Sequence, residues 1–181
     1  MSLTHSARTA KDTGAAYVRA LMELLGEREP LEVLGSLLRD LRAASEGLSD
    51  QQLRRPEASG KWSILEVVCH LADTELVVGF RLRQSLAHER PLLPGIDQDR
   101  WAERLRYREE DFEEALHRLA ALRSANIRLA ASLAPAELDR VGLHEERGEE
   151  TVRHILRMLA GHDLAHVRQV GRIRTVVGGR G

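Results

Sequence analysis

Two of the eight histidines in this 181-residue chain, His162 and His166, lie four residues apart in the sequence Gly161-His162-Asp163-Leu164-Ala165-His166. On a helix, this spacing places both imidazoles on one face, within reach of a single metal ion. Neutral imidazole is a common ligand of Zn²⁺, Ni²⁺ and similar ions. Such a pair also arises by chance in a histidine-rich chain, so two hydrogen-bonded histidines without a metal are the alternative interpretation.

A third histidine, His70, interrupts an apolar row between Val67 and Val77. A metal inside a helical bundle takes its ligands from facing helices, so His70 opposite His162 and His166 would complete a three-histidine set. Catalytic zinc sites have three protein ligands and one open position. We therefore predict one divalent transition metal ion per chain. Zinc and nickel are favoured, and an all-nitrogen ligand set discriminates little between them.

Two acidic residues lie close to these histidines in the sequence. Asp73 follows His70 by one helical turn on the same face, which makes it the candidate catalytic helper for whatever binds at the open position. The alternative for Asp73 is an ordinary surface acid paired with an arginine. Asp163 is rotated by about 100° from its histidine neighbour, so we expect it to cap, to pair with an arginine or to orient a neighbour rather than to bind metal.

The elements that must position these residues are helices. Apolar residues recur at spacings of three and four, and proline and glycine separate the helical segments. The pattern predicts an all-α four-helix bundle with a short extra N-terminal helix, and one domain over residues 1–181. A connection of about twenty residues, long enough to cross the end of the bundle and bring the next helix in parallel, precedes the fourth segment. The predicted helices span about residues 13–25, 30–47, 63–87, 109–133 and 151–176.

Several other side chains have expected structural roles. Ser63 and Glu66 form the capping-box pattern at the start of the His70 helix. Cys69 is expected to be a small buried hydrophobe, and Trp62 and Trp101 are expected to pack in the core. The histidines without a partner at metal spacing are expected on the surface, namely His88, His117, His144 and His154.

Composition excludes several classes of protein. Lys plus Arg number 27 against 28 Asp plus Glu, which lacks the overall charge of a nucleic-acid or membrane-surface binder. One cysteine excludes an intramolecular disulfide and any CxxC motif. The N-terminus has no apolar leader, and no run approaches the eighteen or so apolar residues of a membrane span. We therefore expect a cytoplasmic protein.

The motifs around the histidines resemble those of the DinB-like superfamily. They are Lys61-Trp62-Ser63-Ile64-Leu65-Glu66, His70-Leu71-Ala72-Asp73-Thr74-Glu75 and the segment from Gly161 to His166, supported by Asp97-Gln98-Asp99-Arg100-Trp101-Ala102 and Glu145-Glu146-Arg147-Gly148. The resemblance extends from about Pro30 to Ile173. It implies a four-helix bundle, frequently dimeric, with a divalent metal on His70, His162 and His166. It also implies metal-dependent hydrolysis or thiol transfer.

These observations leave more than one function open. The leading expectation is a metalloenzyme that transfers a low-molecular-weight thiol to an electrophilic small-molecule substrate, since metal-bound thiols are deprotonated. The first alternative is a metal-dependent hydrolase, since a bound metal lowers the pKa of water. Alternatives of another class are a non-catalytic metal- or ligand-binding stress protein and a purely structural helical dimer. A homodimer is expected from the resemblance and from apolar helix faces such as that of Leu116 to Ala130.

Overall fold

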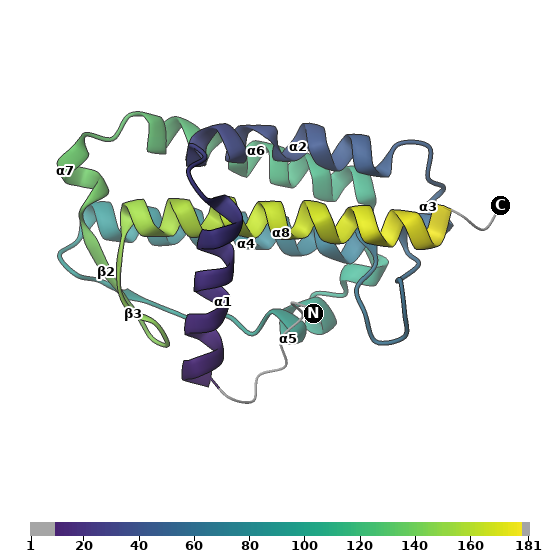
Figure 1. The fold of residues 1–181 in the computed structure, drawn as a ribbon, viewed down its shortest axis with the longest axis horizontal. Helices are drawn as coiled ribbons and strands as arrows, with labels where there is room; N and C mark the ends of the chain where they lie inside the picture. The colour runs from purple at the N-terminus through teal and green to yellow at the C-terminus, as the bar shows by residue number, and fades with distance from the viewer. Residues whose placement is uncertain (1–9, 179–181) are drawn as a thin grey trace.

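The computed structural model describes residues 10–178, with side chains described from residue 14 onward. Within this part of the chain, four long helices form a bundle (Figure 1), and they are α2 (Pro30–Ser45), α4 (Ile64–Ala87), α6 (Phe112–Ala131) and α8 (Val152–Gly178). An additional N-terminal helix, α1 (Ala10–Leu25), packs across α8. The predicted four-helix bundle with an extra N-terminal helix is thereby confirmed.

Helices α4 and α6 run parallel, as the long connection between them allows. Cys69 near the start of α4 lies beside Tyr107 just before α6, and Glu75 further along α4 contacts Asn126 further along α6. Helix α8 runs opposite to both (Figure 1). The connection is more structured than predicted, because it contains β1 (Leu92–Leu93), α5 (Gln98–Arg104) and the 3-10 helix η1 (Tyr107–Glu109).

Helix α6 begins three residues later than the predicted start near Glu109. Glu109 belongs to η1, and the backbone is extended at Glu110 and Asp111. The Asp111 side chain accepts a hydrogen bond from the backbone N–H of Glu114 at 2.9 Å, which is the usual N-cap interaction. At the start of α4 the predicted capping box is present, because Ser63 and Glu66 accept from each other's backbone N–H groups.

A small sheet forms from the two connections that flank α6, where the sequence predicted no strands. Strands β2 (Val141–His144) and β3 (Gly148–Thr151) form an antiparallel hairpin, and β1 pairs with β2 in parallel. The strands are too short to show an alternating pattern, and β1 is 48 positions before β2. Gly142 lies against the side chains of Leu93 and Ser85, where a Cβ would overlap both. Two single-turn helices, α3 (Asp50–Leu53) and α7 (Pro135–Leu138), complete the connections.

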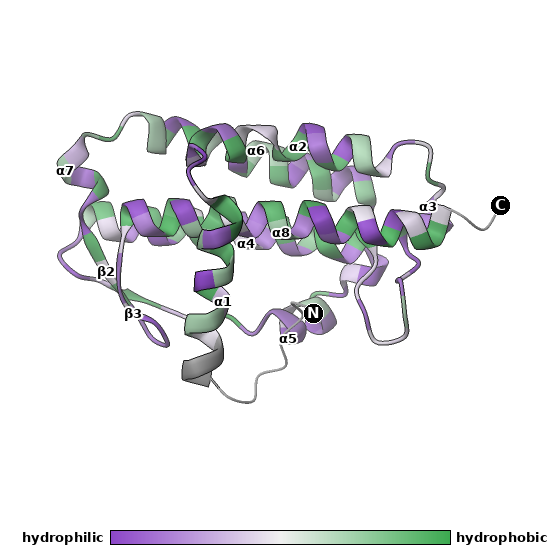
Figure 2. Ribbon diagram, in the orientation of Figure 1, coloured by the Kyte–Doolittle hydropathy of each residue, from purple (hydrophilic) through white to green (hydrophobic). Residues whose placement is uncertain are grey.

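Apolar side chains from all four long helices form the core. Along each of these helices, hydrophobic residues alternate with hydrophilic ones (Figure 2). The face of α6 that suggested a dimer contact is part of this core, since Leu116, Leu119 and Ala130 are buried within the chain. That face is therefore not available for association, which corrects the basis of the dimer expectation. No helix among residues 10–178 has the length and apolar character needed to cross a membrane.

Helix α1 approaches α8 closely at one glycine. A Cβ on Gly161 would overlap the backbone oxygen of Leu21, so the two helices would have to separate. The absence of a side chain at position 161 thus sets how near α1 lies to α8. This contact is one residue before His162, so α1 covers α8 beside the histidine cluster.

Candidate metal centre

The three predicted ligand histidines meet in the interior between two antiparallel helices. His70 comes from α4, and His162 and His166 come from successive turns of α8. The Nε2 atom of His162 lies 3.1 Å from that of His70 and 3.0 Å from that of His166. One nitrogen from each ring lies within 4.8 Å of the others. The structure therefore brings together the set that the sequence predicted.

Burial keeps these imidazoles uncharged. Burial, followed by the charge of His166, holds the pKa of both His70 and His162 well below the ordinary value of 6.5. Burial also lowers the pKa of His166 to about 4, against the opposing effect of its hydrogen bond to Gln169. At neutral pH each ring is therefore neutral and has one nitrogen lone pair, which is the form that binds a metal.

The hydrogen bonding around the cluster fits a metal ion. The Nδ1 atom of His166 lies 2.8 Å from Oε1 of Gln169, and the amide oxygen can only accept. This bond places the ring proton on Nδ1 and leaves the Nε2 lone pair facing the cluster, as metal-binding histidines are commonly arranged. Nitrogens about 2.0–2.1 Å from one tetrahedral ion lie about 3.4 Å apart, close to the spacing found here. Gln169 was not predicted from the sequence, although it follows His166 by three residues on one helix.

Asp73 has a buried tyrosine as its partner rather than a surface arginine. The Tyr107 hydroxyl donates a hydrogen bond to Oδ2 of Asp73 at 2.6 Å. Burial and this bond raise the pKa of Tyr107 far above its ordinary value, so the phenol keeps its proton and remains a donor. Asp73 is half-buried, one turn from His70, and Thr74 Oγ1 lies 3.5 Å from His70 Nε2. The acid is thus held in place beside the cluster.

Two further residues near His70 take the packing roles expected of them. The buried ring of Trp62 lies with its centroid 4.9 Å from that of His70, so it shields one side of that imidazole from water. Cys69 is fully buried, and burial raises the pKa of its thiol to about 12. It is therefore a core residue and not a nucleophile at neutral pH. Trp101 packs against the same core.

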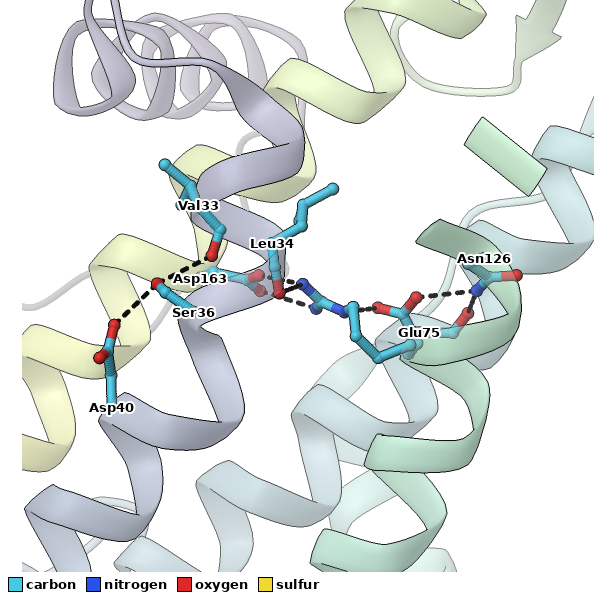
Figure 3. Close-up of polar contacts among 8 residues, drawn as sticks. Val33, Leu34, Ser36, Asp40, Glu75, Asn126 and Asp163 are labelled. Carbon is cyan, nitrogen blue, oxygen red and sulfur yellow. Dashed lines mark hydrogen bonds and ion pairs between the residues drawn. The ribbon is translucent and has the colours of Figure 1, made fainter. Parts of the chain in front are cut away.

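A buried charged layer joins all four long helices (Figure 3), and one of its members, Asp163, is the residue that follows His162. Arg123 of α6 lies between Asp163 of α8 and Glu75 of α4, with Nη1 2.5 Å from Asp163 Oδ2 and Nε 2.8 Å from Glu75 Oε2. Its Nη1 also donates to the backbone oxygen of Leu34 in α2 at 3.0 Å. Asn126 donates to Glu75 at 2.8 Å. Asp163 pairs with an arginine, which is one of the three roles expected of it in place of metal binding.

This layer carries one more negative charge than positive charge when both acids are ionised. Burial raises the pKa of Asp163 to about 6, opposed by Arg123 and reinforced by the charge of Glu75.

The two acids of this layer lie close to the ligand histidines along the chain, because Asp163 adjoins His162 and Glu75 lies five residues after His70. Arg123 therefore fixes the register of the two helices that carry the ligands.

One of the remaining histidines is not where the sequence placed it. His88 and His117 are exposed and His154 is half-buried, but His144 is buried on strand β2. The expectation of a surface position was wrong for His144, because a small sheet buries this residue. In the sheet, His144 is the register partner of Leu93, and its side chain is buried. No alternative metal cluster containing it occurs among the described residues.

Comparison with known proteins finds relatives of this chain in one superfamily. The family model described as the DinB superfamily matches residues 34–170. A relative from Oceanobacillus iheyensis, named "Putative metal-dependent hydrolase", is 30% identical over 128 residues, which cover 67% of this chain and 71% of the relative. Bacillus subtilis YfiT, whose name gives the same function, is 27% identical over 146 residues, covering 78% of this chain and 82% of YfiT.

A solved structure of YfiT from Bacillus subtilis has the same fold. It superimposes with a TM-score of 0.74 at 21% sequence identity, covering 98% of this chain and 94% of that chain. It is described as a "probable metal-dependent hydrolase with an unusual four-helix bundle topology". In the chain studied here, the parallel α4 and α6 are the departure from an alternating up-and-down bundle.

Proposed function

Because this chain belongs to the DinB superfamily, we propose that it is a metal-dependent hydrolase whose divalent ion is held by His70, His162 and His166. The observation that carries the proposal is the convergence of three neutral imidazoles, with Nε2 separations of 3.0 and 3.1 Å. The names of the relatives favour hydrolysis over the thiol transfer that the sequence analysis placed first. Zinc or nickel suits three nitrogen ligands.

A divalent ion in such a site lowers the pKa of a bound water and so supplies a nucleophile near neutral pH. The chain's own residues position and protect the reacting groups. Gln169 fixes the tautomer of His166, and Trp62 covers one side of His70. Asp73, held by the Tyr107 hydroxyl, is the proposed general base, because it is the half-buried carboxylate one turn from a ligand.

Metal analysis of purified protein tests the site. Wild-type protein, His162→Ala and the matched control His154→Ala are dialysed with zinc or nickel and analysed for bound metal. We expect one ion per chain in the wild type and in the His154 variant, and almost none in the His162 variant. Circular dichroism should show the same helix content in all three. Full metal occupancy in His162→Ala would contradict the assignment of the ligands.

Parallel assays of the metal-loaded protein distinguish the functions. One arm is a panel of esters and amides, and the other is an electrophile such as monochlorobimane with a low-molecular-weight thiol. The proposal predicts turnover in the first arm that is lost on chelation and in His162→Ala. Turnover confined to the thiol arm would show a transferase. Full metal loading without turnover in either arm would favour a non-catalytic metal-binding stress protein.

A further inference from the structure

Two buried hydrogen-bond donors lie at the sheet end of the His70 helix without acceptors. Arg81 of α4 is 6% exposed and His144 of β2 is 3% exposed. The Nε atom of Arg81 and the Nε2 atom of His144 are both buried, and neither has a hydrogen-bond partner among the described residues. A buried donor without an acceptor costs free energy, so two together indicate a site that a ligand completes.

The guanidinium of Arg81 has no carboxylate partner among the side chains described from residue 14 onward. Its Nη2 donates to the backbone oxygen of Pro94 at 2.5 Å, which uses one of its five N–H groups. The nearby acid Glu150 is already paired with Arg147, through Nη2 to Oε2 at 3.0 Å and a second contact. Burial, and secondarily the charge of Arg147, lower the pKa of Arg81 to about 10, against the opposing charges of Glu150, Glu146 and Glu145. Arg81 is therefore a buried cation that acids surround at longer range but that none of the described carboxylates pairs with directly.

The tautomer of His144 makes its free nitrogen a donor. Its Nδ1 lies 3.2 Å from the backbone N–H of Glu146 and must accept that hydrogen bond. A neutral imidazole that accepts at Nδ1 carries its proton on Nε2. Burial, followed by the charges of Arg147 and Arg81, lowers the pKa of His144 to about 4, so the ring is neutral at pH 7. The orphan Nε2 atom is thus an N–H group.

Arg81 and His144 lie near each other, and Arg81 is on the face of α4 that bears His70. Arg81 contacts Pro94, which directly follows Leu93, and Leu93 is the register partner of His144. Arg81 follows His70 by eleven residues, which is about three helical turns and returns to the same face. On that face, Thr74 and Val77 between them are only half-buried. Arg81 therefore lies on the same side of α4 as His70, nearer the end of the helix that meets the sheet.

We propose that Arg81 and His144 form a subsite that binds a carboxylate group of the substrate. A carboxylate accepts two N–H bonds in one plane, which suits a guanidinium together with an imidazole N–H. The inference rests on the proposed function, because it assigns a substrate class to the same site. The substrate is then an acid-bearing ester or amide whose carboxylate lies toward β2 while its reacting carbonyl lies at the histidines.

Calorimetric titration with glutarate, and with its neutral analogue glutaramide, tests the subsite on the folded, metal-loaded protein. Wild-type protein should bind glutarate and not glutaramide. Arg81→Gln should weaken glutarate binding at least tenfold, and His144→Asn should weaken it several-fold. The matched control Arg83→Gln removes an exposed arginine from the same helix and should bind like the wild type. Equal glutarate affinity in Arg81→Gln and wild type would overturn the proposal.

Two further variants address loss of folding in Arg81→Gln and binding of glutarate by the metal. Arg81→Lys keeps the charge but not the planar group, so it should fold if Arg81→Gln does not and should still bind glutarate at least threefold more weakly than the wild type. Wild-type affinity in the lysine variant would overturn the proposal. His162→Ala should retain glutarate binding, which shows that the anion is not bound by the metal. Loss of binding in His162→Ala with retention in Arg81→Gln would assign the anion to the metal and refute the subsite.

Hydrolysis assays separate this inference from the proposed function. Substrates are compared as matched pairs, an acid-bearing ester and its neutral amide-capped analogue. Preference for the acid that disappears in Arg81→Gln supports the subsite and the hydrolase together. Glutarate binding that depends on Arg81, without hydrolysis of any substrate, supports the subsite and contradicts the hydrolase. Hydrolysis that is indifferent to the acid and to Arg81 supports the hydrolase and contradicts the subsite.

Discussion

The Nδ1 atom of His166 donates to Oε1 of Gln169 at 2.8 Å, so the ring that joins the histidine cluster is oriented from the next turn of its own helix. Replacing Gln169 with leucine removes the acceptor and frees the ring to adopt the other tautomer. We expect metal affinity to fall about 10- to 100-fold, as for other residues that orient metal ligands. Competition with a chelator of known affinity measures the change. Gln169→Glu, which keeps an acceptor, should bind metal nearly as tightly as the wild type, and an unchanged affinity in the leucine variant would refute this role.

Asp73 is expected to act in turnover and not in metal binding. Asp73→Asn keeps the size of the side chain but removes the base, so kcat should fall by about 10²–10⁴ with full metal content. The measurement is steady-state hydrolysis together with metal analysis of the same sample. Asp139→Asn, which changes an exposed acid, is the control. A rate unchanged in Asp73→Asn would show that the acid serves only to pair with Tyr107.

Arg123 is expected to be essential for stability because it neutralises two buried acids. Arg123→Met leaves Glu75 and Asp163 buried without a cation, and breaking a buried ion pair in this way costs about 3–5 kcal/mol. Urea unfolding of the metal-free protein at pH 7.5 measures the free energy of unfolding. Arg39→Met, at an exposed position, should change it by less than about 0.5 kcal/mol. Similar losses in the two variants would rule out the bridging role of Arg123.

His144 gives a predicted dependence of stability on pH. Its pKa is about 4 in the folded chain and 6.5 when the chain unfolds, so the unfolded state takes up the proton first. The free energy of unfolding is therefore highest above pH 6.5, and the contribution of His144 makes it fall as the pH decreases toward 4. Between pH 7.5 and pH 5 this loss amounts to about 2 kcal/mol, from 1.36 kcal/mol per pKa unit. Unfolding of the metal-free wild type and of His144→Asn at both pH values isolates the contribution of His144. An equal change in the free energy of unfolding with pH in the two proteins would contradict the prediction.

A homodimer requires a surface other than the buried face of α6. Leu76 and Phe80 lie one turn apart on α4 and are 53% and 49% exposed. We propose that this pair lies at the contact between two copies. Sedimentation at micromolar concentration should show a dimer for the wild type and a monomer for the double variant Leu76→Glu with Phe80→Glu. Leu105→Glu, at another exposed leucine, should remain dimeric. A monomeric wild type would end the proposal.

The sequence was sufficient to predict the long helices and the histidine cluster, because both depend on residues a few positions apart on one helix. The capping pattern of Ser63 and Glu66 depends on neighbours three residues apart, and it marks the start of α4 correctly. The histidines stood out because His70, His162 and His166 occupy apolar positions of a helical repeat. Spacing along two helices, together with the resemblance to the DinB-like superfamily, therefore predicted which rings meet.

The partners that come from distant segments could not be predicted in the same way. Arg123 looks like any charged residue on an amphipathic helix, and its pairing with Asp163 spans 40 positions. Tyr107 reaches Asp73 from a 3-10 turn within a connection that the sequence showed only as a loop. His144 is buried because β2 is held by β1 and β3, and such short strands carry no periodic signal of their own.

The order of the helices along the chain has a consequence for protein synthesis. Helix α8 is made after α2, α4 and α6, yet it supplies two of the three histidines and the acid that pairs with Arg123. His70 and His162 are 92 positions apart, so a ribosome-bound chain without α8 cannot close the metal centre. It also leaves the groove between α2 and α4 open and apolar. Nascent chains of this protein are therefore exposed to aggregation and to chaperone binding until the last helix docks.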